Sequence, residues 1–336
     1  MENNNTYSRF LLKVDISGIQ NFIFDIPSDK ASKNLKARSF YVYSLTYFAE
    51  TFFKQNFSHP PVEIIYNGGG NFLVYLWANE NDLKNKIDEF QTHFLQSDIY
   101  PFIAYIKADG NDFDEQNKQL SILLNNEKCR RKLTFTTFDS EIGDIKWDEL
   151  SNNLKESNSF AIREKDKNDA ICVGNLSLTF NDPEITTLSF ENNLLNKFPL
   201  ENNGKIVDFD KIALKALSRG ADEKLAALKM DVDNLGMLFM NKNKDEYKNL
   251  SQAIEYFFSV TLYTKILKPY IENGDIYPVF AGGDDTFLIG SWDKIFEIVP
   301  TIQSEFDKAQ KEWRNKIIKK DDDITISAGL VVVHPK

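Results

Sequence analysis

Three aspartates in the last third of the chain have the residue types and spacing of a divalent-metal site. Asp231 follows an apolar run at 225–230, and Asp284 and Asp285 follow two glycines in the sequence Ala-Gly-Gly-Asp-Asp. Carboxylates that share a site repel each other unless a cation neutralises them. Oxygen ligands favour Mg²⁺ or Mn²⁺ over Zn²⁺, and two such ions are a common device for phosphoryl transfer. The pattern therefore predicts catalysis and metal binding by Asp231, Asp284 and Asp285.

The backbone around these aspartates suits a nucleotide triphosphate. Gly282 and Gly283 permit a tight turn and the close approach of a bulky phosphate group. After Asp231 the chain can offer backbone N–H groups to phosphate oxygens at a helix start, and the predicted contacts are Asn234, Leu235 and Gly236. Lys229 and Arg219 are the nearby candidates for side chains that hold the triphosphate. An ordinary hairpin turn is the alternative, because glycine and aspartate are good turn formers.

A calcium-binding loop of the EF-hand type is excluded by the same residues. The sequence Asp231-x-Asp233-Asn234-x-Gly236 begins like such a loop, which needs an oxygen ligand at its fifth position and glutamate at its twelfth. Leu235 and Lys242 occupy those two positions. The aspartates therefore do not belong to an EF-hand.

The elements that must position these residues are predicted twice along the chain. The first copy has a strand, a helix, two strands joined by a glycine-rich turn, a helix and a strand at 9–15, 31–53, 62–66, 72–77, 81–95 and 100–107. The second repeats this order at 225–230, 247–271, 276–280, 286–289, 295–318 and 324–333. This β-α-β-β-α-β order is the ferredoxin-like arrangement, and its repetition indicates an internal duplication. Its first strand lies beside the central hairpin, so Asp231 should lie beside Asp284 and Asp285.

The predicted fold class is α+β, with two ferredoxin-like domains and a small intervening linker domain. Residues 1–110 form the first domain, 111–215 the linker and 216–336 the second domain. The linker region is rich in Asn, Asp, Glu and Ser, and its strand signals, near 133–137 and 171–178, are weak.

The first copy keeps the turn and loses the carboxylates. Its hairpin is Asn67-Gly68-Gly69-Gly70-Asn71, and Asp15 remains alone on its first strand. We therefore expect this copy to be catalytically silent and still to bind a nucleotide against the active copy. The candidate contacts are Ser17, Arg38, Ser39, Gly69, Gly70 and Asn71. For Arg38 and Ser39 a solvated helix face is an equal alternative.

The composition limits the class of protein. The net charge is −10, so the chain lacks the overall basic character of a protein that grips nucleic acid by itself. The two cysteines, Cys129 and Cys172, are too few for a structural zinc site. The chain begins without a secretory leader and has no long apolar run, so we expect a cytoplasmic protein with no membrane span.

Several of these segments together resemble the large polymerase-cyclase subunit of type III CRISPR effector complexes. The resemblance rests on Asp15-Ile-Ser-Gly-Ile-Gln20, Leu35-Lys-Ala-Arg-Ser-Phe40, the first hairpin, Lys229-Met-Asp-Val-Asp-Asn-Leu-Gly236 and Ala281-Gly-Gly-Asp-Asp-Thr-Phe-Leu-Ile-Gly-Ser-Trp-Asp293. It runs from residue 10 to the end and is weakest between residues 111 and 215.

The resemblance implies a function in antiviral defence. Two facing palm domains in this family bind two ATP molecules, and the Gly-Gly-Asp-Asp palm makes 3′–5′ cyclic oligoadenylate second messengers when target RNA pairs with the CRISPR RNA held by partner subunits. Carried onto this chain, Asp231, Asp284 and Asp285 would hold two Mg²⁺ or Mn²⁺ ions, with ATP as the substrate. The partners would be the other effector subunits with their RNAs.

Three departures from the family qualify this expectation. The three histidines, His59, His93 and His334, include no His-Asp pair, so we expect no HD-type nuclease activity. Cys129 and Cys172 cannot rebuild the zinc site of the family's linker domain. The chain stops just after its last predicted strand, without the family's C-terminal helical domain. Three alternatives therefore stay open: a standalone cyclase that could form a homodimer, a cyclase of the diguanylate type, and a non-catalytic scaffold.

Overall fold

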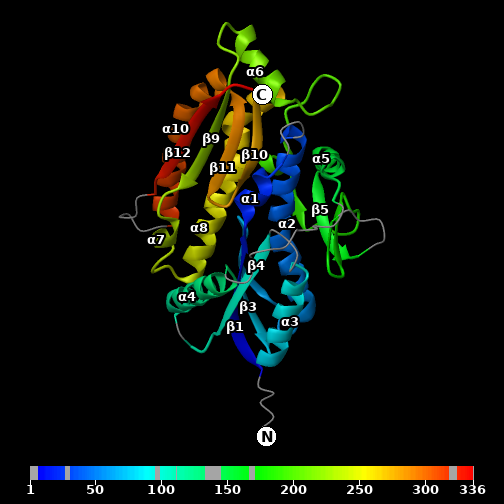
Figure 1. The fold of residues 1–336 in the computed structure, drawn as a ribbon. Coiled ribbons are helices and arrows are strands. Elements are labelled where there is room, and N and C mark those ends of the chain that lie inside the picture. The colour runs from blue at the N-terminus through cyan, green and yellow to red at the C-terminus, as the bar shows by residue number, and fades with distance from the viewer. Residues whose placement is uncertain are drawn as a thin grey trace.

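A computed structural model of the chain describes residues 7–26, 31–94, 99–110, 112–132, 145–165, 171–317 and 324–335. These residues form three four-stranded sheets, of which two have the same topology and the third has shorter strands (Figure 1). The α+β fold class with two ferredoxin-like domains is confirmed.

The first palm contains the sheet β2-β3-β1-β4, in which β1 lies between the hairpin β2–β3 and β4. Its elements are β1 (Ser8–Ser17), α1 (Ile19–Phe24), α2 (Ala31–Asn56), β2 (Glu63–Gly68), β3 (Asn71–Ala78), α3 (Glu80–Thr92) and β4 (Tyr100–Lys107). All neighbouring strands are antiparallel. Residues of β1 on the helix side, such as Phe10, Leu12 and Val14, are fully buried, because they alternate toward the core.

The second palm repeats this topology in the sheet β10-β11-β9-β12. Its elements are β9 (Leu225–Val232), α7 (Leu235–Leu238), α8 (Lys244–Tyr256), α9 (Lys268–Glu272), β10 (Ile276–Gly282), β11 (Asp285–Ser291), α10 (Trp292–Lys316) and β12 (Ile326–Val333). The regular helix predicted at 247–271 is wrong in detail, because two π-helical segments, Phe257–Thr261 and Tyr263–Leu267, join α8 to α9.

The segment between the palms is more regular than its composition indicates. It contains α4 (Phe113–Lys132), α5 (Trp147–Glu156), α6 (Phe209–Ser218) and a sheet of order β6-β7-β5-β8. The strands of this third sheet are β5 (Ser159–Glu164), β6 (Ile171–Val173), β7 (Leu176–Phe180) and β8 (Leu188–Ser189). The strand predicted near 171–178 is a hairpin of β6 and β7, and the one predicted near 133–137 lies outside the described residues.

Each palm packs its long helix against a strand of the other palm. Helix α2 runs along the middle of the molecule between the second and third sheets and contacts β10, while α8 contacts β2 (Figure 1). A single hydrophobic core accordingly continues from the first palm into β10, where it includes Tyr277 and Val279. A second core lies within the second palm.

A buried lysine joins α2 to β10. The Nζ of Lys36 donates a hydrogen bond to the Pro278 carbonyl at 2.7 Å, and burial holds the pKa of Lys36 well below its usual range. The pairing of β10 with β11 shifts register between Pro278 and Phe280. A proline has no N–H to give to a sheet ladder, so a bulge is a typical place for it.

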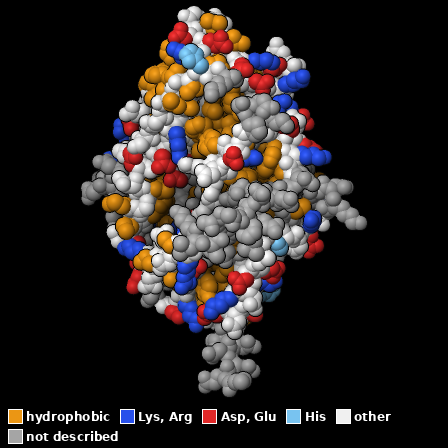
Figure 2. Space-filling model, viewed as in Figure 1, with side chains coloured by type: hydrophobic (Ala, Val, Ile, Leu, Met, Phe, Trp, Pro, Cys, Tyr) orange, Lys and Arg blue, Asp and Glu red, His pale blue; other side chains and the backbone are white. Residues whose placement is uncertain are grey.

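The surface is mixed in charge on the face shown in Figure 2. Apolar side chains gather there over the upper part of the molecule, where the second sheet lies in Figure 1, and Lys and Arg side chains are interspersed among Asp and Glu (Figure 2). Within the described ranges, no helix combines the length and the apolar character needed to cross a membrane.

Candidate active site

The structure brings the three predicted carboxylates together at one end of the second sheet. Asp231 lies opposite Asp285 in the antiparallel pairing of β9 with β11. The N–H of Val232 donates to the carbonyl of Asp284 at 3.1 Å, which ties the end of β9 to the turn between β10 and β11. The predicted position of Asp231 beside the glycine turn is therefore confirmed, and the catalytic role of the three residues stays a prediction.

Burial and mutual repulsion disfavour the charged forms of these carboxyl groups. Burial, and then the charge of Asp284, raise the pKa of Asp285 to about 7. Burial also raises the pKa of Asp284, and the charge of Asp231 adds to this effect. Lys229 opposes the rise, since its Nζ lies 3.8 Å from Asp285 Oδ2. One ammonium group thus faces three carboxyl groups, and a further cation at this place would stabilise their charged forms.

The geometry fits an ion that arrives with a nucleotide better than a closed protein cage. Among the described residues, no three His, Cys, Asp or Glu side chains are grouped tightly enough to hold a metal by themselves. Mg²⁺ commonly takes one or two carboxylates, with waters and substrate phosphates completing its coordination. Asp231, Asp284 and Asp285 supply oxygen donors of that kind.

The glycine turns of the two palms touch each other. A Cβ added to Gly69 would lie 2.9 Å from the Cα of Gly283, and a Cβ added to Gly283 would lie 2.8 Å from the Cα of Gly69. Both residues also have positive φ angles, +54° and +66°, which favour glycine. The turns therefore need glycine for the contact between the palms as well as for the turn itself.

A cavity of about 420 Å³ lies beside the carboxylates, on one side of this glycine contact. Its acidic wall comes from the second palm, and its opposite wall comes from α1 and α2 of the first. Its lining includes Ser39, Val42, Lys229, Asp231, Asp284 and Asp285. This volume lies within the range typical of small-ligand sites, about 300–1,000 Å³.

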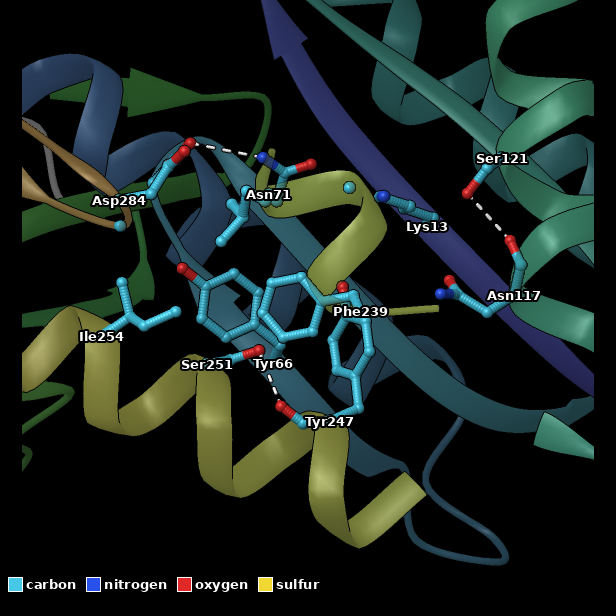
Figure 3. Close-up of a pocket in the computed structure, with 14 residues that line it drawn as sticks. Lys13, Tyr66, Asn71, Asn117, Ser121, Phe239, Tyr247, Ser251, Ile254 and Asp284 are labelled. Carbon is cyan, nitrogen blue, oxygen red and sulfur yellow. Dashed lines mark hydrogen bonds between the residues drawn. The ribbon is translucent and has the colours of Figure 1, made fainter. Parts of the chain in front are cut away.

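A second cavity, of about 190 Å³, lies on the other side of the glycine contact (Figure 3). Here the strand wall comes from the first palm, with Lys13 and Asn71, while α7 and α8 of the second palm contribute Leu235 and Ser251. Asn71 and Asp284 point toward one another at one end of this cavity (Figure 3). The two cavities are thus counterparts, each formed by the strands of one palm and the helices of the other.

The predicted nucleotide contacts divide between these cavities. The larger one is lined by Ser39, Gly70 and Gly282, and the smaller one by Asn71, Leu235, Gly236 and Gly283, while Gly69 lines both. Ser17 and Asn234 line neither: the Ser17 hydroxyl donates to Asp15 at 3.4 Å, and Asn234 precedes α7 with φ 53°. These assignments stay predictions.

Two arginines considered from the sequence have structural contacts. The guanidinium of Arg38 donates to the carbonyls of Phe22 and Asp25, at 2.6 and 2.7 Å, and thereby fixes α1 on α2. Arg219, a candidate phosphate clamp, pairs instead with Asp275 and Asp293. That cluster lies at the Ser291 end of β11, about 20 Å along the strand from Asp285, so the placement of Arg219 near the site is wrong.

Two charged residues at the site were missed from the sequence. Glu255 of α8 accepts a hydrogen bond from the Gly283 N–H, and the Tyr43 hydroxyl approaches its Oε1 at 3.5 Å. Lys128 of α4 pairs with Asp15 at 2.7 Å. Neither belongs to a motif. A glutamate on an amphipathic helix ordinarily faces solvent, and Lys128 is far from Asp15 in the sequence.

Family models match both palms. Residues 224–336 match the second palm domain of Cas10/Cmr2, and residues 8–158 match domain B of the Csm1 subunit. The second match includes α4 and α5, so it continues past the boundary predicted at residue 110.

Curated relatives and solved structures agree with these matches. The chain is 26% identical to the Cas10/Csm1 single-strand-specific deoxyribonuclease of a subtype III-A CRISPR system from Methanocaldococcus jannaschii, over 97% of this chain and 54% of that protein. It is 23% identical to the Enterococcus italicus counterpart, over 88% of this chain and 47% of that protein. The chain thus spans about half the length of these relatives.

The fold likeness covers nearly the whole chain. A Csm1-Csm4 cassette in complex with one ATP superposes with a TM-score of 0.77 and 19% identity, over 98% of this chain and 51% of that one. The cassette in complex with cA4 gives a TM-score of 0.73 and 19% identity, over 96% of this chain and 49% of that one. With matching models for both palms, the chain belongs to the family of Cas10/Csm1 palm-domain proteins.

Proposed function

We propose that this chain joins ATP molecules into 3′–5′ cyclic oligoadenylates at the larger cavity. One observation supports this most strongly: Asp231 lies opposite Asp285, with Asp284 adjacent, in the wall of a cavity of about 420 Å³ that both palms border. Similar structures support the substrate class, since Csm1-Csm4 cassettes have been solved in complex with one ATP and in complex with cA4. Cyclic oligoadenylates would act here as messengers in type III CRISPR defence.

Divalent cations fit the chemistry of this wall. Asp231, Asp284 and Asp285 would hold Mg²⁺ or Mn²⁺, which lower the pKa of an attacking hydroxyl and neutralise a leaving pyrophosphate. Lys229 Nζ, 3.8 Å from Asp285, adds a fixed positive charge for phosphate oxygens. The glycine turn between β10 and β11 leaves the backbone open for the approach of the triphosphate.

Two nucleotides would face each other across the glycine contact. The larger cavity would hold one of them beside the carboxylates, and the smaller cavity the other, beside Lys13 and Asn71. Asp284 lines both cavities, so it lies where the two nucleotides would meet. The reaction would attach the 3′-oxygen of one nucleotide to the α-phosphorus of the other and release pyrophosphate.

The partners would be other type III effector subunits that carry CRISPR RNA and target RNA. Relatives form a Csm1-Csm4 cassette, and nearly the whole of this chain resembles part of the Csm1 component. The formal net charge of −10 suits a subunit that leaves the gripping of long RNA to its partners.

A synthesis assay tests this proposal. The chain is incubated with labelled ATP or GTP and Mg²⁺ or Mn²⁺, with and without effector partners and target RNA, and the products are separated chromatographically. We expect cyclic adenylates from the native chain and at least a 100-fold loss in the double variant Asp284→Ala, Asp285→Ala. The exposed acidic pair Asp88 and Glu89 of α3, changed to alanine, is a matched control.

The outcomes separate the possible functions. Unchanged synthesis by the Asp284→Ala, Asp285→Ala variant would falsify the assignment of the site. Cyclic di-GMP from GTP would identify a diguanylate-type cyclase instead. No product under any condition would leave a scaffold as the remaining function.

A further inference from the structure

The first-palm carboxylate that corresponds to Asp231 is neutralised by a side chain. Asp15 lies opposite Asn71 in the pairing of β1 with β3, which is the counterpart of Asp231 opposite Asp285. Its Oδ1 accepts from the Nζ of Lys128 at 2.7 Å, and the two side chains are 19% and 30% exposed. An ammonium group therefore lies where the second palm would place a metal ion.

Helix α4 brings Lys128 to this position. Asn117, Ser121, Leu124 and Lys128 are four, three and four residues apart, so they lie on one face of the helix. Leu124 of this face is buried, and α4 packs on β1 and β4. Asn117 and Ser121 line the smaller cavity, and Lys128 lies on the same face of the helix, next to Asp15 and outside the residues that line the cavity.

A second lysine belongs to the same place. Lys13 is two residues before Asp15 on β1, so the two side chains share a face of the sheet, and Lys13 points into the smaller cavity (Figure 3). Burial lowers the pKa of Lys13; the charge of Asp15 opposes this shift, and the charge of Lys128 adds a smaller contribution to it. Two ammonium groups around the single carboxylate of Asp15 leave an excess of positive charge, which attracts a further anion.

The two palms therefore have opposite charge balances at equivalent positions. The second palm sets three carboxylates against Lys229, and the first sets Asp15 against Lys13 and Lys128. A triphosphate needs added cations beside the carboxylates of the second palm. Beside Lys13 and Lys128 of the other cluster it meets positive charge supplied by the protein itself.

We propose that Lys128 and Lys13 form a metal-independent phosphate subsite, where Lys128 takes the place of a divalent ion and holds the triphosphate of the nucleotide in the smaller cavity. This inference rests on the proposed function, because it takes a nucleoside triphosphate as the occupant. Its consequence is that the two nucleotides differ in their need for metal.

Equilibrium binding of a non-hydrolysable ATP analogue tests the subsite without relying on activity. In EDTA we expect the native chain to bind one equivalent of the analogue, and in Mg²⁺ two. The variant Lys128→Gln should bind the EDTA-resistant equivalent at least tenfold more weakly, because it loses the positive charge. Lys128→Arg should retain that binding, and Arg130→Gln, on an exposed position of the same helix, is the matched control.

Each outcome decides for or against the subsite. Thermal unfolding of each variant establishes that it is folded, since Lys128 also ties α4 to the sheet. Binding in Mg²⁺ with none in EDTA overturns the subsite and leaves the proposed function intact. Equal EDTA-resistant affinity in Lys128→Gln and the native chain, even with lowered stability, reduces Lys128 to a structural ion pair. An absence of binding under both conditions overturns the inference and the proposed function together.

Discussion

A single carboxyl group, that of Glu255, links the glycine turn of the second palm to helix α2 of the first. It accepts from the Gly283 N–H, and its Oε1 lies 3.5 Å from the Tyr43 hydroxyl of α2. Burial, the largest cause, raises the pKa of Glu255 to about 7, although the hydrogen bonds from Gly283 and Tyr43 oppose the rise. Glu255 therefore positions the turn, although burial destabilises its charged form.

The raised pKa of Glu255 predicts that the stability of the fold depends on pH. Because the pKa of Glu255 is about 7 in the fold against an ordinary value of 4.5, the native state holds an extra proton between these values. The stabilisation that this proton gives the native state is complete below pH 4.5. It is lost as the pH rises through 7, which lowers the free energy of unfolding by up to about 3 kcal/mol. Glu255→Gln, which keeps an acceptor for Gly283, should lack this loss.

Denaturant unfolding at pH 5 and pH 8 measures the difference. We expect the native chain and Glu255→Gln to have similar unfolding free energies at pH 5, and the variant to be the more stable at pH 8. Asp285, whose pKa is also raised to about 7, titrates in both proteins and cancels in the comparison. Parallel pH profiles of the two proteins would contradict the assignment.

The residues of the site were predictable to different degrees. Asp231 could be found because it ends an apolar strand, and Asp284 and Asp285 because they follow two glycines at a turn; these local patterns fix their places in the sheet. Glu255 and Lys128 could not, because their roles depend on contacts between elements far apart in the chain. Arg38 was placed on the correct helix, but its carbonyl partners on α1 are tertiary contacts that its neighbours in sequence do not indicate.

At the scale of elements, the two hairpins β2–β3 and β10–β11 form one structural unit through Gly69 and Gly283. No side chain separates the two turns, so a single methyl group at Gly69 would lie 2.9 Å from the opposite Cα and must push the turns apart. The carboxylates follow Gly283 directly, so their positions depend on this contact.

Gly69→Ala should therefore impair synthesis although Gly69 carries no catalytic group. We expect a loss of about 1–2 kcal/mol of stability from the positive φ, and at least a tenfold loss of cyclic adenylate synthesis from the displaced turn. Gly110→Ala is the matched control, because Gly110 has φ +69° and open space around it. Equal loss of synthesis in both variants would show that strain alone, and not the contact, is responsible.

The order of elements in both palms was predictable because apolar periodicity and glycine turns are local signals. The helix α4 was missed, since its buried residues Phe113, Leu120 and Leu124 form a narrow stripe that exposed Ile122 and Leu123 obscure. The π-helical turns at 257–267 were missed as well, because apolar residues there fit a regular helix equally well.

At the scale of the whole molecule, the palms share a core and do not pack as separate domains. Tyr277 of β10 is fully buried among residues of the first core and packs edge-on against Phe198 and Phe209. Lys36 of α2 is anchored next to it on Pro278. Strands of the second palm are therefore part of the structure that supports the first.

A shared core predicts that the chain unfolds in one cooperative transition. Calorimetry should give a single peak whose calorimetric and van't Hoff enthalpies agree. Tyr277→Ala should lower the free energy of unfolding of the whole chain by about 3–5 kcal/mol, because it leaves a cavity in the core common to both palms. Tyr256→Ala, on α8, is the control, since Tyr256 is 61% exposed and should change stability little. Independent palms would instead give two peaks, of which Tyr277→Ala would move one. In that case the shared core would not couple the two cavities, and their coupling would depend on the contact between Gly69 and Gly283 alone.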